Sequence, residues 1–407
     1  MTMAESSFPT RLSFAQAQAI VREVAAAQRL PPEQRAVTRT AGSVLAQDVI
    51  APLALPPFAN SAMDGFALRA DDSGSGASLQ LVGEQFAGLD AGLAIGPGQC
   101  VRITTGAPIP AGVDAVVMKE DVRVVDGRLH LAAAVAAGKH VRPAGEDVAV
   151  GDLLMRAGTR LSPAQASLAA AVGLAELPVS RRPTVAVFTS GDELRPPGQT
   201  LRAGEIHDSN GSLLLNLLLA EGLDPVAWPI LPDDPARMRA LLRDAGEAFD
   251  VVLTCGGVSA GEKDHLPGIV AELGAIHFWK VMMRPGMPVL FGRIGQAQVL
   301  GLPGNPVAVL ASFLTFGRQL LRGLQGDDRG APTAHARLTQ ALAKSHDRRE
   351  FLRGQLLPGD DGVLRVRPHP ATGSHRLRGA ADSDALIVLP EQAHAWAAGD
   401  VLQVLPY

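Results

Sequence analysis

The sequence feature that most constrains the fold is a succession of apolar strand, glycine-containing loop and helix, repeated between residues 184 and 321. The clearest copy, residues 250–264, reads DVVLTCGGVSAGEKD. Its β-branched run at residues 251–254 is typical of a strand that is buried on both faces. Because strands and helices alternate, the segment predicts a three-layer α/β domain with a mainly parallel sheet between helices.

Two other strands in this segment end in marked loops, which read TSGDEL and PGNP. Ligands bind beyond the carboxyl ends of strands in an open parallel sheet, so we expect all three loops to line one crevice. Gly256 and Gly257 lack a Cβ and would let backbone amides approach a phosphate or another anion. Glu193 and Asp264 are expected to face the same crevice, although a carboxylate beside a glycine is also commonly a solvated loop residue or a helix N-cap.

The acidic residues of these loops indicate a metal site, and two basic residues of a neighbouring segment indicate a site for an anion. Carboxylates without a Cys or His cluster favour a hard, oxygen-seeking ion such as Mg²⁺ over zinc, and such ions usually serve phosphate groups. Lys280 and Arg284 flank a strand end in FWKVMMRPGMP, and an arginine can hold an oxyanion through two hydrogen bonds. Two exposed charges would explain the same pair, so the residues alone leave both interpretations open.

Helix caps and short alternating runs outside this segment predict further domains. Ser13 is expected to cap one helix, and Ser162 and Pro163 to open a second, which could pair with the first. Short strands separated by Gly, Pro and Asp predict small β domains. The expected division is an N-terminal α+β domain (1–50 with 146–180), an inserted small β domain (51–145), the α/β domain (181–325) and a C-terminal β-barrel domain (326–407).

Composition and charge narrow the class of protein. The chain has 407 residues with 47% hydrophobic residues and a net charge of −4, which argues against a nucleic-acid-binding protein. Its two cysteines, Cys100 and Cys255, suit a reducing cytoplasm. No uninterrupted apolar run reaches the roughly 18 residues needed to cross a bilayer, and the first residues contain no apolar signal region. We therefore expect a cytoplasmic protein that does not bind a membrane.

Nine segments in fixed order resemble the molybdopterin molybdenumtransferase family, which includes the bacterial molybdenum insertase, its plant counterpart and the homologous domain of gephyrin. A weaker match follows around REFLRG and TGSHRLRG. The nine segments read PPFANSAMDGFA, TTGAPIPAGVDAVV, RPAGEDV, GDLLMRAGTRLSPAQ, VFTSGDEL, IHDSNG, VLTCGGVSAGEKD, FWKVMMRPGMP and GLPGNPVAVL.

The resemblance implies a four-domain protomer, usually dimeric, whose active site lies in a cleft between the α/β domain of one chain and the second domain of its partner. It implies a Mg²⁺-dependent reaction in which adenylated molybdopterin and molybdate give the molybdenum cofactor and AMP. The molybdopterin adenylyltransferase and chaperones of molybdoenzymes are implied as further partners.

The resemblance also assigns roles to individual positions. The acidic and hydroxyl positions that matter in the family are matched by Asp64, Thr105, Asp147, Glu193, Asp233 and Asp264. Within this set, Asp64, Thr105, Glu193 and Asp264 are expected to be catalytic, and Asp64, Glu193 and Asp264 to hold the metal. Substrate-binding and loop positions are matched by Gly256, Gly257, Ser259, Lys280, Arg284, Pro303, Pro306, Arg353 and Ser374.

Two residues depart from the family pattern near the implied oxyanion pocket. Met287 stands where the family commonly has a second lysine, and Ala308 where it commonly has a serine. Arg284 and Arg353 could compensate, and the preference for molybdate or tungstate stays open. Two alternative functions also stay open. One is a molybdopterin adenylyltransferase, which usually lacks the extra β domains, and the other is a non-catalytic scaffold like gephyrin.

Overall fold

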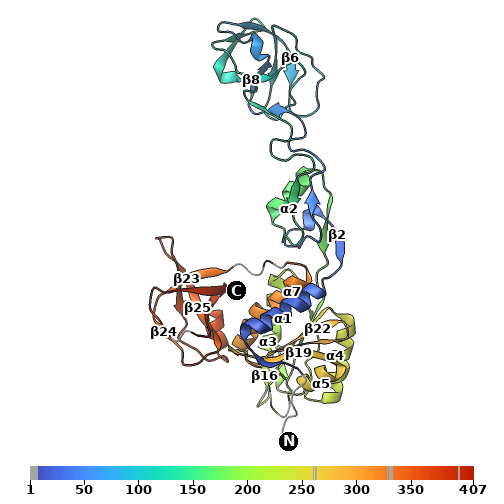
Figure 1. Ribbon diagram of the computed structural model, residues 1–407, viewed down its shortest axis with the longest axis vertical. Helices are drawn as coiled ribbons and strands as arrows, with labels where there is room; N and C mark the ends of the chain where they lie inside the picture. The colour runs from blue at the N-terminus through green and yellow to red at the C-terminus, as the bar shows by residue number, and fades with distance from the viewer. Residues whose placement is uncertain (1–7, 260, 262–263, 328, 330–332, 393–394) are drawn as a thin grey trace. The chain divides into compact units, whose positions relative to one another are not determined.

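The predicted alternation of strands and helices produces a seven-stranded sheet with the order β1-β19-β21-β22-β18-β14-β17 (Figure 1). The computed structural model describes residues 8–259, 261, 264–327, 329, 333–392 and 395–407. Neighbouring strands are parallel except where β21 runs antiparallel to β19 and β22, so the expected mainly parallel sheet is confirmed. The strands are β1 (Thr10–Leu12), β14 (Val185–Thr189), β17 (Val226–Ala227), β18 (Val251–Cys255), β19 (Gly274–Val281), β21 (Leu290–Ile294) and β22 (Ala297–Leu302).

Helices cover both faces of this sheet, as predicted. Val185 and Val187 of β14 belong to one buried cluster, whereas Ala186 and Phe188 belong to the other, because successive strand residues point to opposite faces. Residues of α1, α3, α6 and α7 contribute to the first cluster, and residues of α4 and α5 to the second. These helices are α1 (Phe14–Ala27), α3 (Ser209–Ala220), α4 (Pro235–Ala248), α5 (Leu266–Leu273), α6 (Pro306–Ser312) and α7 (Arg318–Leu324).

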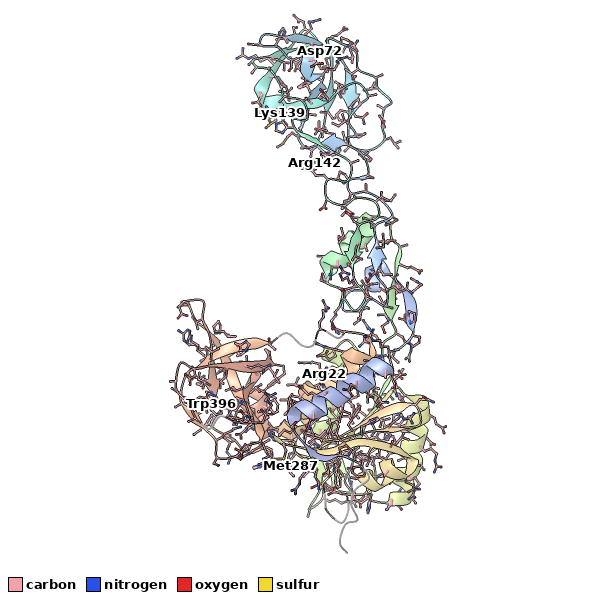
Figure 2. The ribbon with its side chains drawn as sticks, in the orientation of Figure 1. Arg22, Asp72, Lys139, Arg142, Met287 and Trp396 are labelled. Carbon is pink, nitrogen blue, oxygen red and sulfur yellow. The ribbon has the colours of Figure 1, made fainter. Side chains whose placement is uncertain are left out.

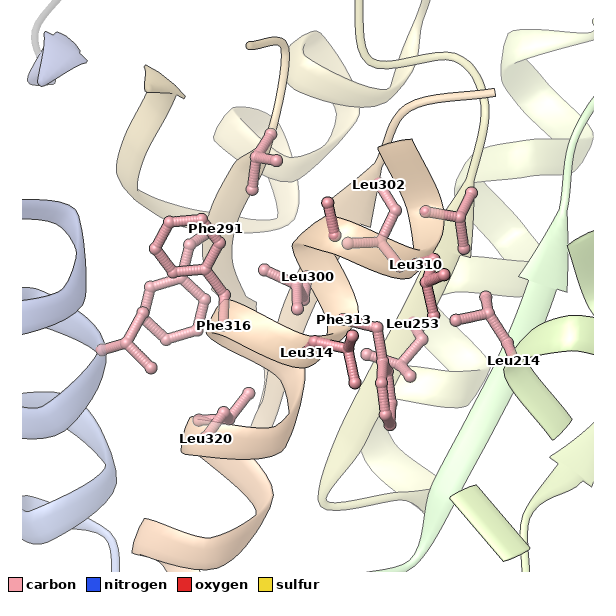
Figure 3. Packing of buried hydrophobic residues seen from close by; sticks show 14 of the residues in the cluster. Leu214, Leu253, Phe291, Leu300, Leu302, Leu310, Phe313, Leu314, Phe316 and Leu320 are labelled. Atoms are coloured by element: carbon pink, nitrogen blue, oxygen red, sulfur yellow. The ribbon is translucent and has the colours of Figure 1, made fainter. Parts of the chain in front are cut away.

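The helix that follows the PGNP loop is the most deeply buried. Between α6 and α7 the chain forms a π-helical turn, η4 (Phe313–Gly317), whose Thr315 hydroxyl donates to the carbonyl of Ala311. Figure 3 shows this helix against leucines of β18, β22 and α3. The stretch Pro306–Leu324 is long and apolar enough to cross a membrane, but 78% of its apolar window is buried inside the protein. It is therefore a core helix.

The N-terminal helix packs within the larger α/β part of the chain. Ser13 caps α1 as expected, and Ser162 likewise caps α2 (Pro163–Ala171). Helix α1 contacts α7 and the sheet. A Cβ on Gly323 of α7 would lie 2.7 Å from the Cβ of Ala25, so small residues let the two helices approach closely. The apolar face of α1 is thereby buried in the first cluster. The expected pairing of the two N-terminal helices stays a prediction.

The described chain divides into two units. The larger unit comprises the described residues of Met1–Glu33, Gly42–Ala46 and Ser180–Tyr407, and the smaller unit comprises Gln34–Ala41 and Gln47–Val179. α1 therefore belongs to the larger unit and α2 to the smaller one. The four-domain division is finer than this and stays a prediction.

The C-terminal part of the larger unit is the expected β-barrel. Five strands close into a ring in the order β25-β26-β23-β29-β27, with β27 pairing back to β25. β20 runs parallel to β25, so the sheet of the barrel begins in the segment that follows β19. The elements are β20 (Met283–Arg284), β23 (Ala334–Leu338), β24 (Leu342–Ala343), β25 (Arg349–Pro358), β26 (Leu364–Pro368), α8 (Leu377–Ala381), β27 (Ala385–Leu389), β28 (Ala395–Trp396) and β29 (Val401–Pro406).

The smaller unit contains a six-stranded sheet with the order β8-β5-β7-β6-β10-β9. Phe66 and Leu68 of β5 pack in one hydrophobic cluster and Ala67 in another, so both faces of the sheet are covered. Its strands are β5 (Gly65–Leu68), β6 (Ser78–Gln85), β7 (Gln99–Ile103), β8 (Ala115–Met118), β9 (Val122–Val125) and β10 (Arg128–Leu131).

Short elements complete the chain. The two-residue strands β15 (Leu194–Arg195) and β16 (Ile206–His207) pair in the larger unit. The remaining elements are β2 (Pro32–Ala36), η1 (Val37–Arg39), β3 (Val49–Ile50), β4 (Asn60–Ser61), η2 (Ala70–Asp72), η3 (Lys119–Asp121), β11 (Val141–Arg142), β12 (Leu153–Met155) and β13 (Glu176–Ser180).

Candidate functional site

The three loops predicted to share a crevice do meet at one edge of the sheet. Thr189, Cys255 and Leu302 are the last residues of three adjacent parallel strands and lie opposite one another. Beyond them the loops are hydrogen-bonded together. The amide of Ser190 donates to the carbonyl of Cys255 and the amide of Gly256 donates to the carbonyl of Leu302, both at 2.9 Å. The carboxyl ends of β14, β18 and β22 therefore form one continuous rim.

The two glycines of the central loop are required by packing as well as by any ligand. Gly256 and Gly257 have φ values of 95° and 67°, in the left-handed region that favours glycine. A Cβ on Gly256 would lie 2.6 Å from the Oγ of Ser190, and a Cβ on Gly257 would lie 3.3 Å from the same atom. Their expected role in admitting phosphates stays a prediction. Ser259, two residues further on, is exposed.

The two carboxylates of this rim already have neighbours in their own loops. One oxygen of Asp264 accepts a hydrogen bond from the amide of Gly261 at 2.7 Å. The carboxylate of exposed Glu193 folds beside Gly191, where a Cβ would lie 2.5 Å from its Oε2. Asp233, the neighbouring acidic position, donates its amide to Asp192 at 3.2 Å. Glu193 and Asp264, two of the three expected metal ligands, thus lie in loops at the same edge of the sheet.

The chemistry of these donors fits Mg²⁺. Within the described ranges, no group of three or more His, Cys, Asp or Glu side chains is placed to hold a metal ion by itself. Mg²⁺ is commonly bound through only one or two protein carboxylates and completes its shell with water and substrate phosphates. Two carboxylates beside an amide-rich loop therefore suit a Mg²⁺ ion that arrives with a phosphorylated substrate.

Asp64 and Thr105 lie together in the smaller unit. One oxygen of Asp64 accepts from the amide of Thr105 at 2.8 Å and from its hydroxyl at 3.0 Å, and Lys119 lies 3.9 Å from the other oxygen. These two hydrogen bonds hold the pKa of Asp64 below its ordinary value. Asp147 lines a separate hollow of the same unit, with Asn60 and Arg142.

Lys280 is connected to the glycine loop through the side chain of Trp279. It has a positive φ of 69°, and its ammonium group lies 4.1 Å from the ring centroid of Trp279. The indole nitrogen of Trp279 in turn donates to the carbonyl of Val258, inside the glycine loop, at 2.8 Å. The lysine is thereby anchored beside the loop that is expected to receive phosphates.

A second part of the site is a cavity of about 450 Å³ between the α/β domain and the barrel. Four predicted site residues line it: Arg284, Pro303, Arg353 and Ser374. Met287 and Ala308, the two departures from the family pattern, line it as well. Lys280 and Pro306 are absent from its described lining. We call this space the barrel cavity.

The PGNP loop links the glycine loop to the barrel cavity. Pro303 lines the cavity, and its carbonyl accepts from the thiol of Cys255 at 3.4 Å. Burial raises the pKa of that thiol, so it is a structural group and not a nucleophile. The carbonyl of Gly304 accepts from the side-chain amide of Asn210 at 2.6 Å. The two halves of the candidate site therefore share one loop as a wall.

Sequence analysis missed several residues of the barrel cavity. Arg348, Glu350, His369 and His375 line it, and they come from β25 and from the loops of the barrel. Arg348 directly precedes the REFLRG segment, so a basic pair was the one signal that could have drawn attention to it. Their position depends on how the barrel packs on the α/β domain.

Three family models match successive parts of the chain. The MoeA N-terminal region (domain I and II) matches residues 12–173, a probable molybdopterin binding domain matches residues 186–323, and the MoeA C-terminal region (domain IV) matches residues 335–407. Together they span both units of the structure.

Curated relatives and a solved structure agree with these matches. Molybdopterin molybdenumtransferase 2 of Mycobacterium tuberculosis is 40% identical over 384 residues, which cover 90% of this chain and 93% of the relative. Molybdopterin molybdenumtransferase of Haemophilus influenzae is 35% identical over 373 residues, or 90% and 92% of the two chains. The crystal structure of a molybdopterin biosynthesis MoeA protein from Pyrococcus horikoshii has a TM-score of 0.82 and 30% identity, and covers 97% of this chain and 99% of that chain.

Proposed function

We propose a reaction for this chain, which belongs to the molybdopterin molybdenumtransferase family and is a transferase of molybdenum cofactor biosynthesis. The reaction is the Mg²⁺-dependent insertion of molybdate into adenylated molybdopterin, with release of AMP. One observation carries the proposal. The glycine loop contacts the PGNP loop, which also forms a wall of the arginine-lined barrel cavity.

The arrangement meets the main electrostatic demand of this chemistry. Molybdate and a phosphoanhydride are both anions, so bringing them together requires positive charge near both. Lys280 supplies charge beside the glycine loop, and Arg284 supplies it at the barrel cavity. Backbone amides of the glycine loop add uncharged donors for the phosphates. When the phosphoanhydride bond breaks, the same groups stabilise the charge that develops on AMP.

Glu193 and Asp264 would hold the Mg²⁺ ion, together with the partner subunit's Asp64. Bound there, Mg²⁺ would neutralise phosphate charge and polarise the phosphorus. We place the active site in a cleft between the subunits of a homodimer. We place the protein in the cytoplasm, where the buried free thiols of Cys100 and Cys255 would stay reduced. The adenylyltransferase and molybdoenzyme chaperones are the proposed partners before and after this step.

The proposal is tested with purified protein, adenylated molybdopterin, molybdate and Mg²⁺. We expect Mg²⁺-dependent AMP release together with a product that activates a cofactor-free molybdoenzyme. Formation of adenylated molybdopterin from ATP and molybdopterin would instead identify an adenylyltransferase. A folded protein that gives neither product would support the scaffold alternative.

Substitution of Asp264 tests its role as a metal ligand. We expect Asp264→Ala to reduce Mg²⁺-dependent AMP release by about a hundredfold or more, because a developing charge loses its counter-ion. Asp244→Ala, on the exposed surface of α4, is the matched control and should leave the rate unchanged. AMP release from Asp264→Ala at the rate of the unsubstituted protein would exclude this role.

A further inference from the structure

We propose that Trp279 is a positioning residue, which holds the ammonium group of Lys280 beside the glycine loop so that the lysine binds a phosphate of the substrate. The inference deepens the proposed function and rests on it, because this phosphate belongs to adenylated molybdopterin and, after the reaction, to AMP. Sequence analysis assigns Lys280 to anion binding but gives Trp279 no role.

The backbone of β19 turns at Lys280. In a regular strand, residues 278 and 280 would point to one face of the sheet, and residues 279 and 281 to the other. Phe278 and Val281 instead belong to the same hydrophobic cluster, whereas Trp279 belongs to the cluster on the opposite face. Lys280 makes this change of direction with a φ of 69°, a left-handed conformation that a residue other than glycine adopts rarely and at an energetic cost.

This turn brings two consecutive side chains together that a regular strand would keep on opposite faces. The ammonium group of Lys280 lies 4.1 Å from the centroid of the Trp279 ring. A cation over an aromatic face is attracted by the electrons of the ring, and tryptophan attracts it most strongly. The ring thereby restricts a long side chain with many rotamers. An ammonium group has three N–H donors, so contact with the ring on one side leaves donors on the other for a phosphate oxygen.

The ring of Trp279 is itself fixed to the glycine loop. The residue is only 8% exposed, and its Nε1 donates to the carbonyl of Val258 at 2.8 Å. Val258 directly follows the two glycines of the loop and is 1% exposed. It packs tightly on β22, because a Cβ on Gly301 would lie 2.7 Å from its Cγ1. The indole therefore contacts both the loop and the lysine, and it sets where the ammonium group lies relative to the loop.

A double-mutant cycle in the full chain tests the inference through the affinity for AMP with Mg²⁺, measured by isothermal titration calorimetry. Lys280→Met should weaken binding about tenfold or more, because a charge-assisted contact with the phosphate is lost. Trp279→Leu should weaken it about fivefold, because the lysine loses the ring that positions it. In a Lys280→Met background, Trp279→Leu should change the affinity by less than about twofold. An equal loss in both backgrounds would mean that Trp279 acts on the fold alone, and it overturns the inference.

The two other tryptophans of the chain supply matched controls. Trp228 belongs to the same hydrophobic cluster as Trp279 and packs on the rings of Phe188 and Phe249, with centroids 5.3 and 5.7 Å away. Trp396, labelled in Figure 2, lies in β28 of the barrel. Trp228→Leu and Trp396→Leu should each leave the affinity for AMP within about twofold of the unsubstituted protein. A loss in either control as large as in Trp279→Leu overturns the inference.

A conservative substitution decides the question if Trp279→Leu does not fold. Trp279→Phe keeps a ring face for the ammonium group but cannot donate to the carbonyl of Val258, so only the link to the loop is lost. Its affinity for AMP should fall about threefold with Lys280 present and should not change in the Lys280→Met background. An affinity equal to that of the unsubstituted protein, or an equal loss in both backgrounds, overturns the inference.

The outcome for Trp279 is separable from the outcome for the proposed function. An unsubstituted protein that binds and releases AMP, with additive effects of the two substitutions, removes only the role of Trp279. An unsubstituted protein that does neither removes the proposed function, and with it the phosphate that Lys280 is proposed to bind. A supporting result also predicts a kinetic signature, in which Trp279→Leu lowers kcat/KM for adenylated molybdopterin about fivefold with Lys280 present and leaves it unchanged in the Lys280→Met background.

Discussion

Gly256 is a position at which a single added methyl group would disturb the candidate site. Its φ of 95° strains any other residue, and the Oγ of Ser190 occupies the place of a Cβ at 2.6 Å. The TSGDEL loop and the glycine loop therefore pack against each other with no spare room. Two arginines of the barrel cavity show how neighbours differ between side chains of identical chemistry. Arg353 donates to backbone carbonyls, whereas Arg348 lies against the thioether of Met287.

At this scale we expect Gly256→Ala to destabilise the protein by about 2 kcal/mol or more and to reduce AMP release, because the two loops must separate. Gly268→Ala is the control, since Gly268 lies in α5, a Cβ there would meet nothing within 4 Å, and alanine favours helix by about 1 kcal/mol. Denaturant unfolding followed by tryptophan fluorescence measures both. Equal stability of Gly256→Ala and the unsubstituted protein would contradict the packing argument.

At the scale of elements, Asp250 ties the beginnings of β14 and β18 together at the edge of the sheet away from the loops. Both of its oxygens accept from Arg181, at 2.7 and 2.8 Å, and one of them also accepts from the amide and hydroxyl of Thr184. Burial by itself would raise the pKa of Asp250, but these partners outweigh burial and the pKa is lowered. The ionised form therefore stabilises the folded protein.

We expect Asp250→Asn to lower stability at pH 7 by about 1–2 kcal/mol, because a bidentate charge-assisted pair is lost. The folded-state pKa lies below the ordinary value of 3.8, so the contribution is present above that value and is lost as the pH falls through the folded-state pKa. The difference between the two proteins should therefore shrink below about pH 4. Unfolding free energies measured from pH 7 to pH 3 check this, and a constant difference would contradict it.

At the scale of the whole molecule, the expected catalytic residues are divided between the two units. Asp64 and Thr105 belong to the smaller unit, whereas Glu193 and Asp264 belong to the larger one. The proposed homodimer would join the Asp64 of one chain to the Asp264 of the other. Two chains that each lack a different carboxylate could then form one intact site together, which is impossible if the site lies within one chain.

Mixing two inactive variants tests the arrangement. Asp64→Ala and Asp264→Ala should each be inactive alone, yet a mixture refolded or co-expressed in equal amounts should recover about a quarter of the full activity, because half of the dimers are mixed and each has one intact site. Analytical ultracentrifugation confirms that the mixture is dimeric. A dimeric mixture without activity would place both carboxylates of a site in one chain.

The sequence by itself determined the local structure of this protein and the kinds of functional side chain that it contains. The two-residue period of Val185 to Phe188, the caps at Ser13 and Ser162 and the glycines after β18 follow from backbone sterics and hydrogen bonding within a few residues. These are short-range effects, so the α/β sheet, its helices and the meeting of its loops could be predicted.

Only the tertiary structure decided which partners these side chains contact. The packing of α1 against α7 depends on Gly323, and the guanidinium of Arg348 contacts Met287, which lies 61 residues earlier in the chain. The commitment of Arg353 depends on carbonyls of a loop about twenty residues later. A side chain's charge and donors are properties of its residue type, but the partner that satisfies them is set by whichever segment folding brings beside it.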